Sequence, residues 1–366
     1  MSDKKQVYHG SDIELIEKAY GVPKEKIINF SDNVNPLGVS DTVKQKLASN
    51  LDLISTYPDR NYTALRKKIG AYVHGDPENI MVGNGATELI SILIQNLQPA
   101  KAIVVGPTYS EYEREIRLQG GQVQYYGLSE ELDFQVDSDH LITHISSAIG
   151  LLVICNPNNP TSSSFSQKDL VKILDHCKET NTFVLIDETY MEFAQNQEEL
   201  TAIPLLGTYD NFMVLRGVSK FFSAPGLRLG YGLCSNTTLL ESINQQKNPW
   251  TLNTLGSFAG EIMFEDEAYI QKTYSLIQEE RTRIYEELLT WPEVHAYPPT
   301  ANFILLKIKK KHINATNVFE KLIRKGFLIR DASSFNFLDQ RFIRFCFKMP
   351  KENDQLLLAL KEILTR

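Results

Sequence analysis

A single lysine among small and apolar residues is the first candidate for chemistry in this sequence. The stretch LRGVSKFFSAPGLRLG carries Lys220 in its middle and an arginine, Arg228, eight positions later. The apolar run 212–215 just before it is typical of a buried strand. A lysine held in an apolar pocket loses its proton more easily and becomes a nucleophile. The alternative is a structural lysine that reaches the surface along its stem, and this stretch alone leaves both open.

The elements that must position this lysine follow a regular alternation between residues 80 and 235. Short β-rich apolar runs alternate with two stretches, 86–97 and 167–180, that carry apolar residues at helical spacing. Runs that are apolar on both faces and separated by helices predict a mostly parallel sheet covered on both sides. The runs expected to be strands are 80–82, 101–106, 122–127, 151–156, 183–188, 212–217 and 229–234.

Polar residues or glycine turns follow five of these expected strands. Ligands of such sheets bind beyond the carboxyl ends of the strands, so these residues would meet in one crevice. Taken singly, each has an ordinary explanation, such as a helix cap for Asp187 or packing for Tyr109. Their joint occurrence favours a binding site. The residues concerned are the glycine turn 83–88, Tyr109, the asparagines of 156–159, Asp187 with Glu188 and Tyr190, and Ser219 with Lys220.

The order of these motifs resembles that of the fold-type I, pyridoxal-phosphate-dependent aminotransferase family (class I/II), over nearly the whole chain. The resemblance implies an α/β fold, with a large domain whose mostly parallel sheet is sandwiched by helices and a smaller α+β C-terminal domain. It also implies pyridoxal 5'-phosphate as the cofactor. The expected divisions are an N-terminal arm of extended and turn character at 1–40, a large cofactor-binding domain at 41–245 and a small domain at 246–366.

The resemblance assigns roles to the candidate residues one by one. Lys220 would bond the cofactor's aldehyde, Asp187 would pair with the protonated pyridine nitrogen, and Tyr190 would hydrogen-bond the phenolate oxygen. The contact with Asp187 would keep the pyridine ring protonated, so that the ring acts as an electron sink. The other implied cofactor contacts are Asn159 on the same oxygen, Tyr109 on the ring face, and Gly85, Ala86, Thr87, Ser219 and Arg228 on the phosphate at a helix N-terminus.

The stretch STYPDRNYTALRKKI, residues 55–69, also matches the family. Its tyrosine, Tyr57, would cross to the cofactor phosphate of a partner subunit, which implies a homodimer with shared active sites. Two positions depart from the family's pattern: Gly217 stands where a serine or threonine is usual, and Ser162 stands where a glycine is usual. A dinucleotide-binding interpretation of GNGATE fails, because it lacks the third glycine of that motif.

Two arginines near the C-terminus are candidates for binding a small phosphorylated amino substrate. Arg344 resembles the family's carboxylate-binding arginine, and Arg330 resembles a second anion contact. Arg341 is the better candidate for a plain surface ion pair. Within the family the most similar groups are threonine-phosphate decarboxylases of cobalamin biosynthesis and, next, histidinol-phosphate aminotransferases.

The opening HGSDIELIEKAYGVPKEKIINFSDNVNPLG resembles that of the decarboxylases, although Ser11 replaces a glycine common there. It implies that His9, Ser31 and Asn33 contribute to the pocket for the substrate phosphate. The implied reaction is decarboxylation of L-threonine O-3-phosphate to (R)-1-amino-2-propanol O-2-phosphate. The alternative is transamination of histidinol phosphate with 2-oxoglutarate, and a third class is a non-catalytic regulator on the same fold. Such regulators carry a DNA-binding segment before the arm, and they need neither Lys220 nor Asp187.

Composition limits which other classes of protein this chain could belong to. The chain has 366 residues and a formal charge of −7, so no basic surface indicates nucleic acid as a partner. No apolar run reaches membrane-spanning length, and the N-terminus lacks the apolar core of a signal peptide. The four cysteines are scattered without paired spacing, which predicts reduced thiols, no metal site and a cytoplasmic location.

Overall fold

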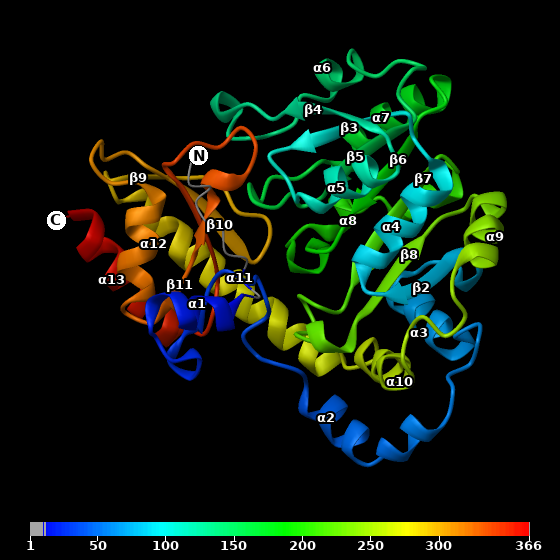
Figure 1. Cartoon of the computed structure of the whole chain (residues 1–366), viewed down its shortest axis with the longest axis horizontal. Coiled ribbons are helices and arrows are strands. Elements are labelled where there is room, and N and C mark those ends of the chain that lie inside the picture. Colours follow the sequence, from blue (N-terminus) through cyan, green and yellow to red (C-terminus); the bar gives the residue numbers. More distant parts are fainter. Residues whose placement is uncertain (1–9, 11, 366) are drawn as a thin grey trace.

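The computed structural model describes residues 10 and 12–365, which form a large and a small part side by side (Figure 1). A seven-stranded sheet lies at the centre of the large part, in the order β2-β8-β7-β6-β5-β3-β4. Its strands are β2 (Ile80–Asn84), β3 (Lys101–Gly106), β4 (Gln122–Gly127), β5 (Leu151–Cys155), β6 (Phe183–Asp187), β7 (Phe212–Gly217) and β8 (Leu229–Leu233).

The expected strands and helices of this sheet are confirmed, and the sheet is mostly parallel as expected. Only β8 runs antiparallel to its neighbours β2 and β7. A parallel neighbour would need a crossover of a dozen or more residues. The connection 218–228 that carries Lys220 is shorter and holds only one 3₁₀ turn (Pro225–Leu227), so β8 turns back beside β7.

Both faces of the sheet are covered by apolar side chains, and this explains why its strands read as continuous apolar runs. Along β5, Leu151 and Val153 belong to one buried cluster, while Leu152 and Ile154 belong to the other. Successive strand residues point to opposite faces, so each run must be apolar throughout. The helices of the large part are α2 (Asp41–Ala48), α3 (Thr63–Val73), α4 (Ala86–Leu97), α5 (Glu111–Leu118), α6 (Ser138–Ile142), α7 (Gln167–Glu179), α8 (Gln197–Leu200) and α9 (Thr237–Gln246).

The small part is built on an antiparallel sheet in the order β12-β13-β10-β9. Its strands are β9 (Val294–Ala296), β10 (Phe303–Ile308), β12 (Arg330–Asp331) and β13 (Phe342–Cys346). Helix α11 (Glu267–Leu289) runs between the two parts (Figure 1), and α12 (Ala315–Ile323) and α13 (Pro350–Thr365) complete the small part. This is the α+β arrangement expected for the C-terminal end.

The N-terminal segment differs from the arm that the sequence predicts. Residues Ile13–Tyr20 form a helix, α1, and β1 (Ile28–Asn29) pairs in parallel with β11 (Phe327–Leu328) of the small part. The expectation of extended and turn character was therefore wrong for 13–20. The physical reason is the apolar spacing of that stretch, which buries Ile16 completely and sets the Tyr20 ring against Phe319 of α12.

Helix α10 (Thr254–Met263) helps to locate the boundary between the large and the small part. It lies after the expected boundary at 245, yet it packs against α3 and α2 of the large part. Its Gly260 approaches Leu65 of α3 so closely that a Cβ would lie 2.7 Å from that side chain. We therefore propose that the large part extends through α10 and that the division falls within α11.

Within the described residues, no helix is both long and apolar enough to cross a membrane. The four cysteines are buried and free of disulfides, as expected. In residues 10 and 12–365, no group of three or more histidine, cysteine or acidic side chains is arranged to hold a metal ion.

Candidate active site

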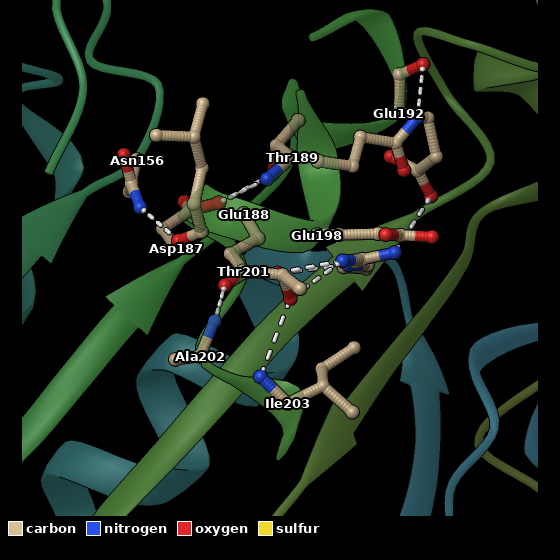
Figure 2. A network of polar contacts seen from close by, with 12 residues as sticks. Asn156, Asp187, Glu188, Thr189, Glu192, Glu198, Thr201, Ala202 and Ile203 are labelled. Atoms are coloured by element: carbon tan, nitrogen blue, oxygen red, sulfur yellow. Dashed lines mark hydrogen bonds and ion pairs between the residues drawn. The ribbon is translucent and has the colours of Figure 1, made fainter. Parts of the chain in front are cut away.

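Asp187 ends β6, and three hydrogen bonds fix its buried carboxylate. Tyr112 donates its hydroxyl to one carboxylate oxygen at 2.6 Å, and Thr189 donates both its hydroxyl and its amide to the other at 2.5 and 2.9 Å. Figure 2 shows Thr189 next to Asp187, with Asn156 on the neighbouring strand end bonded to the Asp187 carbonyl. The carboxylate thus has one defined direction, as a partner for a ligand cation requires.

Lys220 follows β7 and points into the same region from the connection to β8. Its amine donates to the carbonyl oxygen of Asp32 at 2.6 Å. Burial, together with the nearby Arg344 guanidinium, lowers the pKa of this amine to about 8 against the opposing effect of Asp32. Lys220 is therefore partly buried, with its amine held by the Asp32 carbonyl and poised to lose its proton.

Five of the predicted site residues meet around Tyr190. The Tyr190 hydroxyl accepts a hydrogen bond from the Asn33 amide at 3.2 Å. Arg344 donates to the carbonyl of Ser31 at 2.6 Å and to the side-chain oxygen of Asn159. The segment around Ser31 and Asn33, the turn after β5, the turn after β6 and strand β13 therefore converge on one pocket.

A glycine turn after β2 forms a cradle at the start of α4. Gly85 has a φ of 83°, and a Cβ there would lie 2.4 Å from the guanidinium of Arg228. Ala86 and Thr87 open the helix, where free backbone amides and the helix dipole favour an anion. The structure therefore brings Gly85, Ala86, Thr87 and Arg228 together, as predicted for a phosphate site.

Strand β8 passes directly behind this cradle because Gly230 has no side chain. A Cβ at Gly230 would lie 2.3 Å from the amide nitrogen of Ala86 and 2.4 Å from the carbonyl carbon of Gly85. Both contacts are with backbone, which has no room to yield. The glycine at 230 therefore allows the sheet to support the cradle.

Gly230→Ala is expected to destabilise the protein by roughly 1–3 kcal/mol, the usual cost of overpacking, and to weaken cofactor binding by distorting the cradle. The measurements are thermal unfolding of the cofactor-free protein and titration with pyridoxal 5'-phosphate. Gly207→Ala is the matched control, because a Cβ at Gly207 meets no atom within 4 Å. Equal melting temperatures for the two variants would contradict the assignment of Gly230.

Tyr109 lies between the cradle and Asp187. Its ring meets Tyr112 edge-on at 5.6 Å, and its hydroxyl interacts with Thr87. Burial raises the pKa of Tyr109, and the acidic groups Glu111 and Asp187 raise it further. This position suits a ring that covers one face of a planar ligand. Ser219, the remaining cofactor residue predicted on this chain, is partly buried next to Lys220.

The two departures from the family's pattern have physical explanations. Gly217 pairs with Gly230 in the β7–β8 register, and a Cβ at 217 would lie 3.2 Å from the carbonyl of Leu229, which is tighter than usual. Ser162 takes a positive φ of 62°, and its hydroxyl accepts hydrogen bonds from the amides of Thr300 and Ala301. The serine thus ties the turn after β5 to the chain entering β10.

The two candidate substrate arginines lie directly opposite one another on β12 and β13. Arg330 pairs with Arg344 in the strand register, so both side chains stand on the same face of the small sheet. Arg330 donates to the hydroxyl of Ser334 at 2.9 Å and lies over the Phe335 ring. Arg341 instead pairs with Asp339 at the surface, as expected.

One predicted residue, Tyr57, is not brought to this site. Tyr57 is 80% exposed, and its ring packs against Trp250 with centroids 4.9 Å apart. That exposure leaves its predicted contact with a partner subunit untested. His9 lies outside the described residues.

Sequence reasoning missed several residues that hold the site. Tyr112 and Thr189 fix Asp187, while Asp32 and Lys348 lie beside Lys220. Signals for two of them were present. Tyr112 stands one helical turn after Tyr109, and Thr189 is placed two residues after an aspartate, where a side-chain turn forms readily.

The pocket fits the cofactor that the sequence implies. The cradle at Gly85 has the open backbone and neighbouring guanidinium that a phosphate needs. Asp187 offers a fixed carboxylate, and Lys220 offers an amine of lowered pKa. Among the described residues, Asn33 Oδ1 and Arg344 Nε are buried without a hydrogen-bond partner, which is the state expected where a polar ligand belongs.

Comparison with known proteins agrees with this geometry. A family model described as aminotransferase class I and II matches residues 25–360. A protein from Caldanaerobacter subterraneus subsp. tengcongensis, provisionally named as a threonine-phosphate decarboxylase, is 39% identical over 90% of this chain and 88% of its own length. Threonine-phosphate decarboxylase from Salmonella typhimurium is 32% identical over 98% of this chain and 96% of its own length.

Among solved structures, histidinol-phosphate aminotransferase from Clostridium acetobutylicum superposes with a TM-score of 0.86 at 29% identity, covering 92% of this chain and 98% of its own. The residues matched by the family model, 25–360, include the described residues that build this site. The chain therefore belongs to the class I and II aminotransferase family, and it is an enzyme whose cofactor is pyridoxal 5'-phosphate.

Proposed function

We propose that this enzyme removes carbon dioxide from L-threonine O-3-phosphate and releases (R)-1-amino-2-propanol O-2-phosphate. The observation that carries the proposal is the pair of buried arginines, Arg330 and Arg344, which lie opposite one another on adjacent strands and on the same face of the small sheet. Threonine phosphate carries two anionic groups within a few bonds of its amine. The two relatives with the highest identities above carry this activity in their names.

Arg344 has the environment of an anion-binding residue. It is 4% exposed, and the two acceptors of its hydrogen bonds, Ser31 O and Asn159 Oδ1, are both neutral. A buried charge whose hydrogen-bond acceptors are all neutral is costly, so a substrate carboxylate would complete the site. The unpartnered Nε offers a further donor to that carboxylate.

Arg330 adds a second positive charge next to the first. Burial and the neighbouring Arg344 together lower the pKa of Arg330 to about 10. Like charges directly opposite on paired strands destabilise a sheet. A substrate with a phosphate and a carboxylate would relieve that repulsion, and two predicted phosphate contacts, Ser31 and Asn33, lie on the segment that passes Arg344 and Tyr190.

The residues of this pocket divide the work of the reaction. When bound, pyridoxal 5'-phosphate supplies an electron sink for the pair released as the bond from Cα to the carboxylate breaks. Arg344, which lies over the Phe303 ring, would hold that carboxylate until carbon dioxide leaves, and the Tyr190 ring packs edge-on against the same phenylalanine. Lys220 Nζ would then deliver a proton to Cα, which its lowered pKa permits near neutral pH.

We further propose a homodimer in the cytoplasm with active sites shared between subunits. Tyr57 and Trp250, both exposed, line a groove of about 570 Å³ together with residues 54–58 and 252–255. An exposed aromatic pair of this kind is typical of an interface. The free, buried thiols support a reducing compartment.

The deciding experiment is incubation of the cofactor-loaded enzyme with threonine phosphate and no keto acid, followed by mass spectrometry. The expected result is many turnovers, each losing one carbon dioxide. The alternative is transamination of histidinol phosphate, which the similarity to the Clostridium aminotransferase favours. Turnover of histidinol phosphate with 2-oxoglutarate, and none with threonine phosphate, would establish that alternative.

A further inference from the structure

A chain of polar contacts links helices of the small part to the reactive lysine. Its last member is Asp32, whose backbone carbonyl accepts the hydrogen bond of the Lys220 amine at 2.6 Å. The neighbouring residue Asn35 donates its amide to the Lys220 carbonyl at 3.0 Å. The segment from Asp32 to Asn35 therefore hydrogen-bonds Lys220 both at its side-chain amine and at its backbone carbonyl.

The side chain of Asp32 is held by a lysine from the small part. Lys348, two residues after β13, donates to Asp32 Oδ1 at 3.1 Å and to the carbonyl of Val34 at 3.3 Å. The amide of Val34 also donates to Asp32 Oδ1 at 3.1 Å. The Lys348 ammonium thus bridges both ends of a tight turn, and that turn presents the Asp32 carbonyl to Lys220.

Hydrogen bonds to Asn353 in turn fix the backbone of Lys348. Asn353 of α13 accepts from the Lys348 amide and donates to the Lys348 carbonyl, both at 2.8 Å. The Asn353 amide group also donates to Glu280 of α11 at 2.6 Å. Asn353 and Lys348 are both buried, so the contacts run without a break from α11 to the nucleophile. Buried networks whose members are satisfied hold their parts rigidly.

We propose that Lys348 and Asp32 are positioning residues, which hold the Asp32 carbonyl against the Lys220 amine and balance the charge around it. The proposal rests on Lys220 being the reactive lysine, and it does not depend on which substrate the enzyme takes. Neither residue is assigned a direct contact with substrate.

The charges that face Lys220 come from several elements and oppose one another. Burial lowers the pKa of the Lys220 amine most; the Asp32 carboxylate and Cys346 raise it, while Arg344 and Lys348 lower it. Removing the charge of Lys348 leaves the Asp32 carboxylate uncompensated, so the pKa of Lys220 should rise. Removing the charge of Asp32 leaves Lys348 unopposed, so the pKa should fall. Removing both should restore a value near that of the native enzyme.

The test measures the proton affinity of Lys220 in the cofactor-free protein. The variants are Lys348→Met, Asp32→Asn and the double variant, with Lys172→Met as the control, because Lys172 forms an exposed pair with Asp139 at 2.8 Å on the surface. The readout is the rate at which acetic anhydride labels Lys220 as a function of pH, followed by peptide mass spectrometry. We expect shifts of roughly one pH unit, upward for Lys348→Met and downward for Asp32→Asn.

The sign pattern separates positioning from a merely structural role. Shifts in the same direction for both single variants, or no shift in either, would overturn the proposal. If Lys348→Met fails to fold by circular dichroism, Asp32→Asn alone must lower the pKa and Lys348→Arg must leave it near the native value. Failure of the threonine phosphate assay with an intact sign pattern would remove only the substrate assignment.

Discussion

Lys220→Ala is expected to lower turnover by at least ~10²–10⁴-fold, the range for loss of a general acid–base residue, and to abolish covalent attachment of the cofactor. In the native enzyme, reduction with borohydride should fix one cofactor to the peptide that contains Lys220. The variant should gain no such mass. Lys172→Ala is the matched control, because that lysine is exposed on α7 and pairs with Asp139.

The size of this effect follows from the environment of the amine. With a pKa of about 8, roughly 10% of the Lys220 amine is neutral at pH 7, against about 0.04% for an ordinary lysine. The Asp32 carbonyl also holds the amine in one direction at 2.6 Å. A reducible covalent bond between the cofactor and the Lys220→Ala protein would overturn the assignment of Lys220.

The sequence predicted well those features that depend on neighbours along the chain. The strands of the large sheet are apolar on both faces, so each appears as a continuous apolar run whose ends are easily located. The residues at those ends, Asp187 and Lys220 among them, occupy one pocket because parallel strands place their carboxyl ends at one edge. The cradle at Gly85 follows from the same rule.

Features that depend on distant segments were not predictable in this way. Lys348 and Asp32 are 316 positions apart, and nothing local to either one predicts their contact. Helix α1 has only eight residues, which is too short to be stable by itself, and it depends on the contact of its Tyr20 ring with the distant Phe319 of α12. The position of α10 against α3 likewise depends on packing between elements that are nearly 190 residues apart.

One contact between separate strands, the ion pair of Arg216, can be recognised in the sequence. Arg216 is a charged residue inside the otherwise apolar strand β7, and a charge in such a place must be paired or it would destabilise the fold. Its partner, Glu188, directly follows Asp187 in the sequence. The combination of an acidic residue after one strand and an arginine at the end of the next indicates an ion pair beneath the site.

Arg216→Met is expected to destabilise the protein by about 3–5 kcal/mol, the usual cost of removing one partner of a buried ion pair. Arg216 donates to Glu188 at 2.8 and 3.1 Å, and it lies 4.0 Å from Glu192. Figure 2 shows Glu188 next to Thr201 and Ala202, which donate to its two oxygens at 2.8 and 2.6 Å. Methionine preserves much of the volume but leaves two buried carboxylates without a cation.

The control for this prediction is Arg117→Met. Arg117 pairs with Glu113 on the exposed face of α5, where loss of an ion pair costs at most about 1 kcal/mol. Chemical denaturation of both variants, at equal temperature and salt, measures the difference. Equal free energies of unfolding would show that the Arg216 pair contributes no more than a surface pair.

The pH dependence of the free energy of unfolding tests the role of Arg216 in a second, independent way. Burial raises the pKa of Glu192 from 4.5 to about 7, and Arg216 opposes that rise, so the variant should raise it further. The folded protein then binds a proton that the unfolded chain has lost, which means stability falls as pH rises above about 4.5. The deficit of Arg216→Met should therefore be larger at about pH 8 than at about pH 5.

A double variant, Glu188→Gln with Arg216→Met, distinguishes charge from packing. Glutamine keeps one oxygen to accept from the Ala202 amide, and its NH₂ group can donate to the Thr201 hydroxyl, so neutralising both partners should recover part of the lost stability. If the double variant is less stable than Arg216→Met alone, packing of the arginine stem, and not its charge, would explain the loss. Recovery would instead show that Arg216 serves to neutralise Glu188 next to Asp187. The same ion pair would then both stabilise the fold and hold the catalytic carboxylate in position.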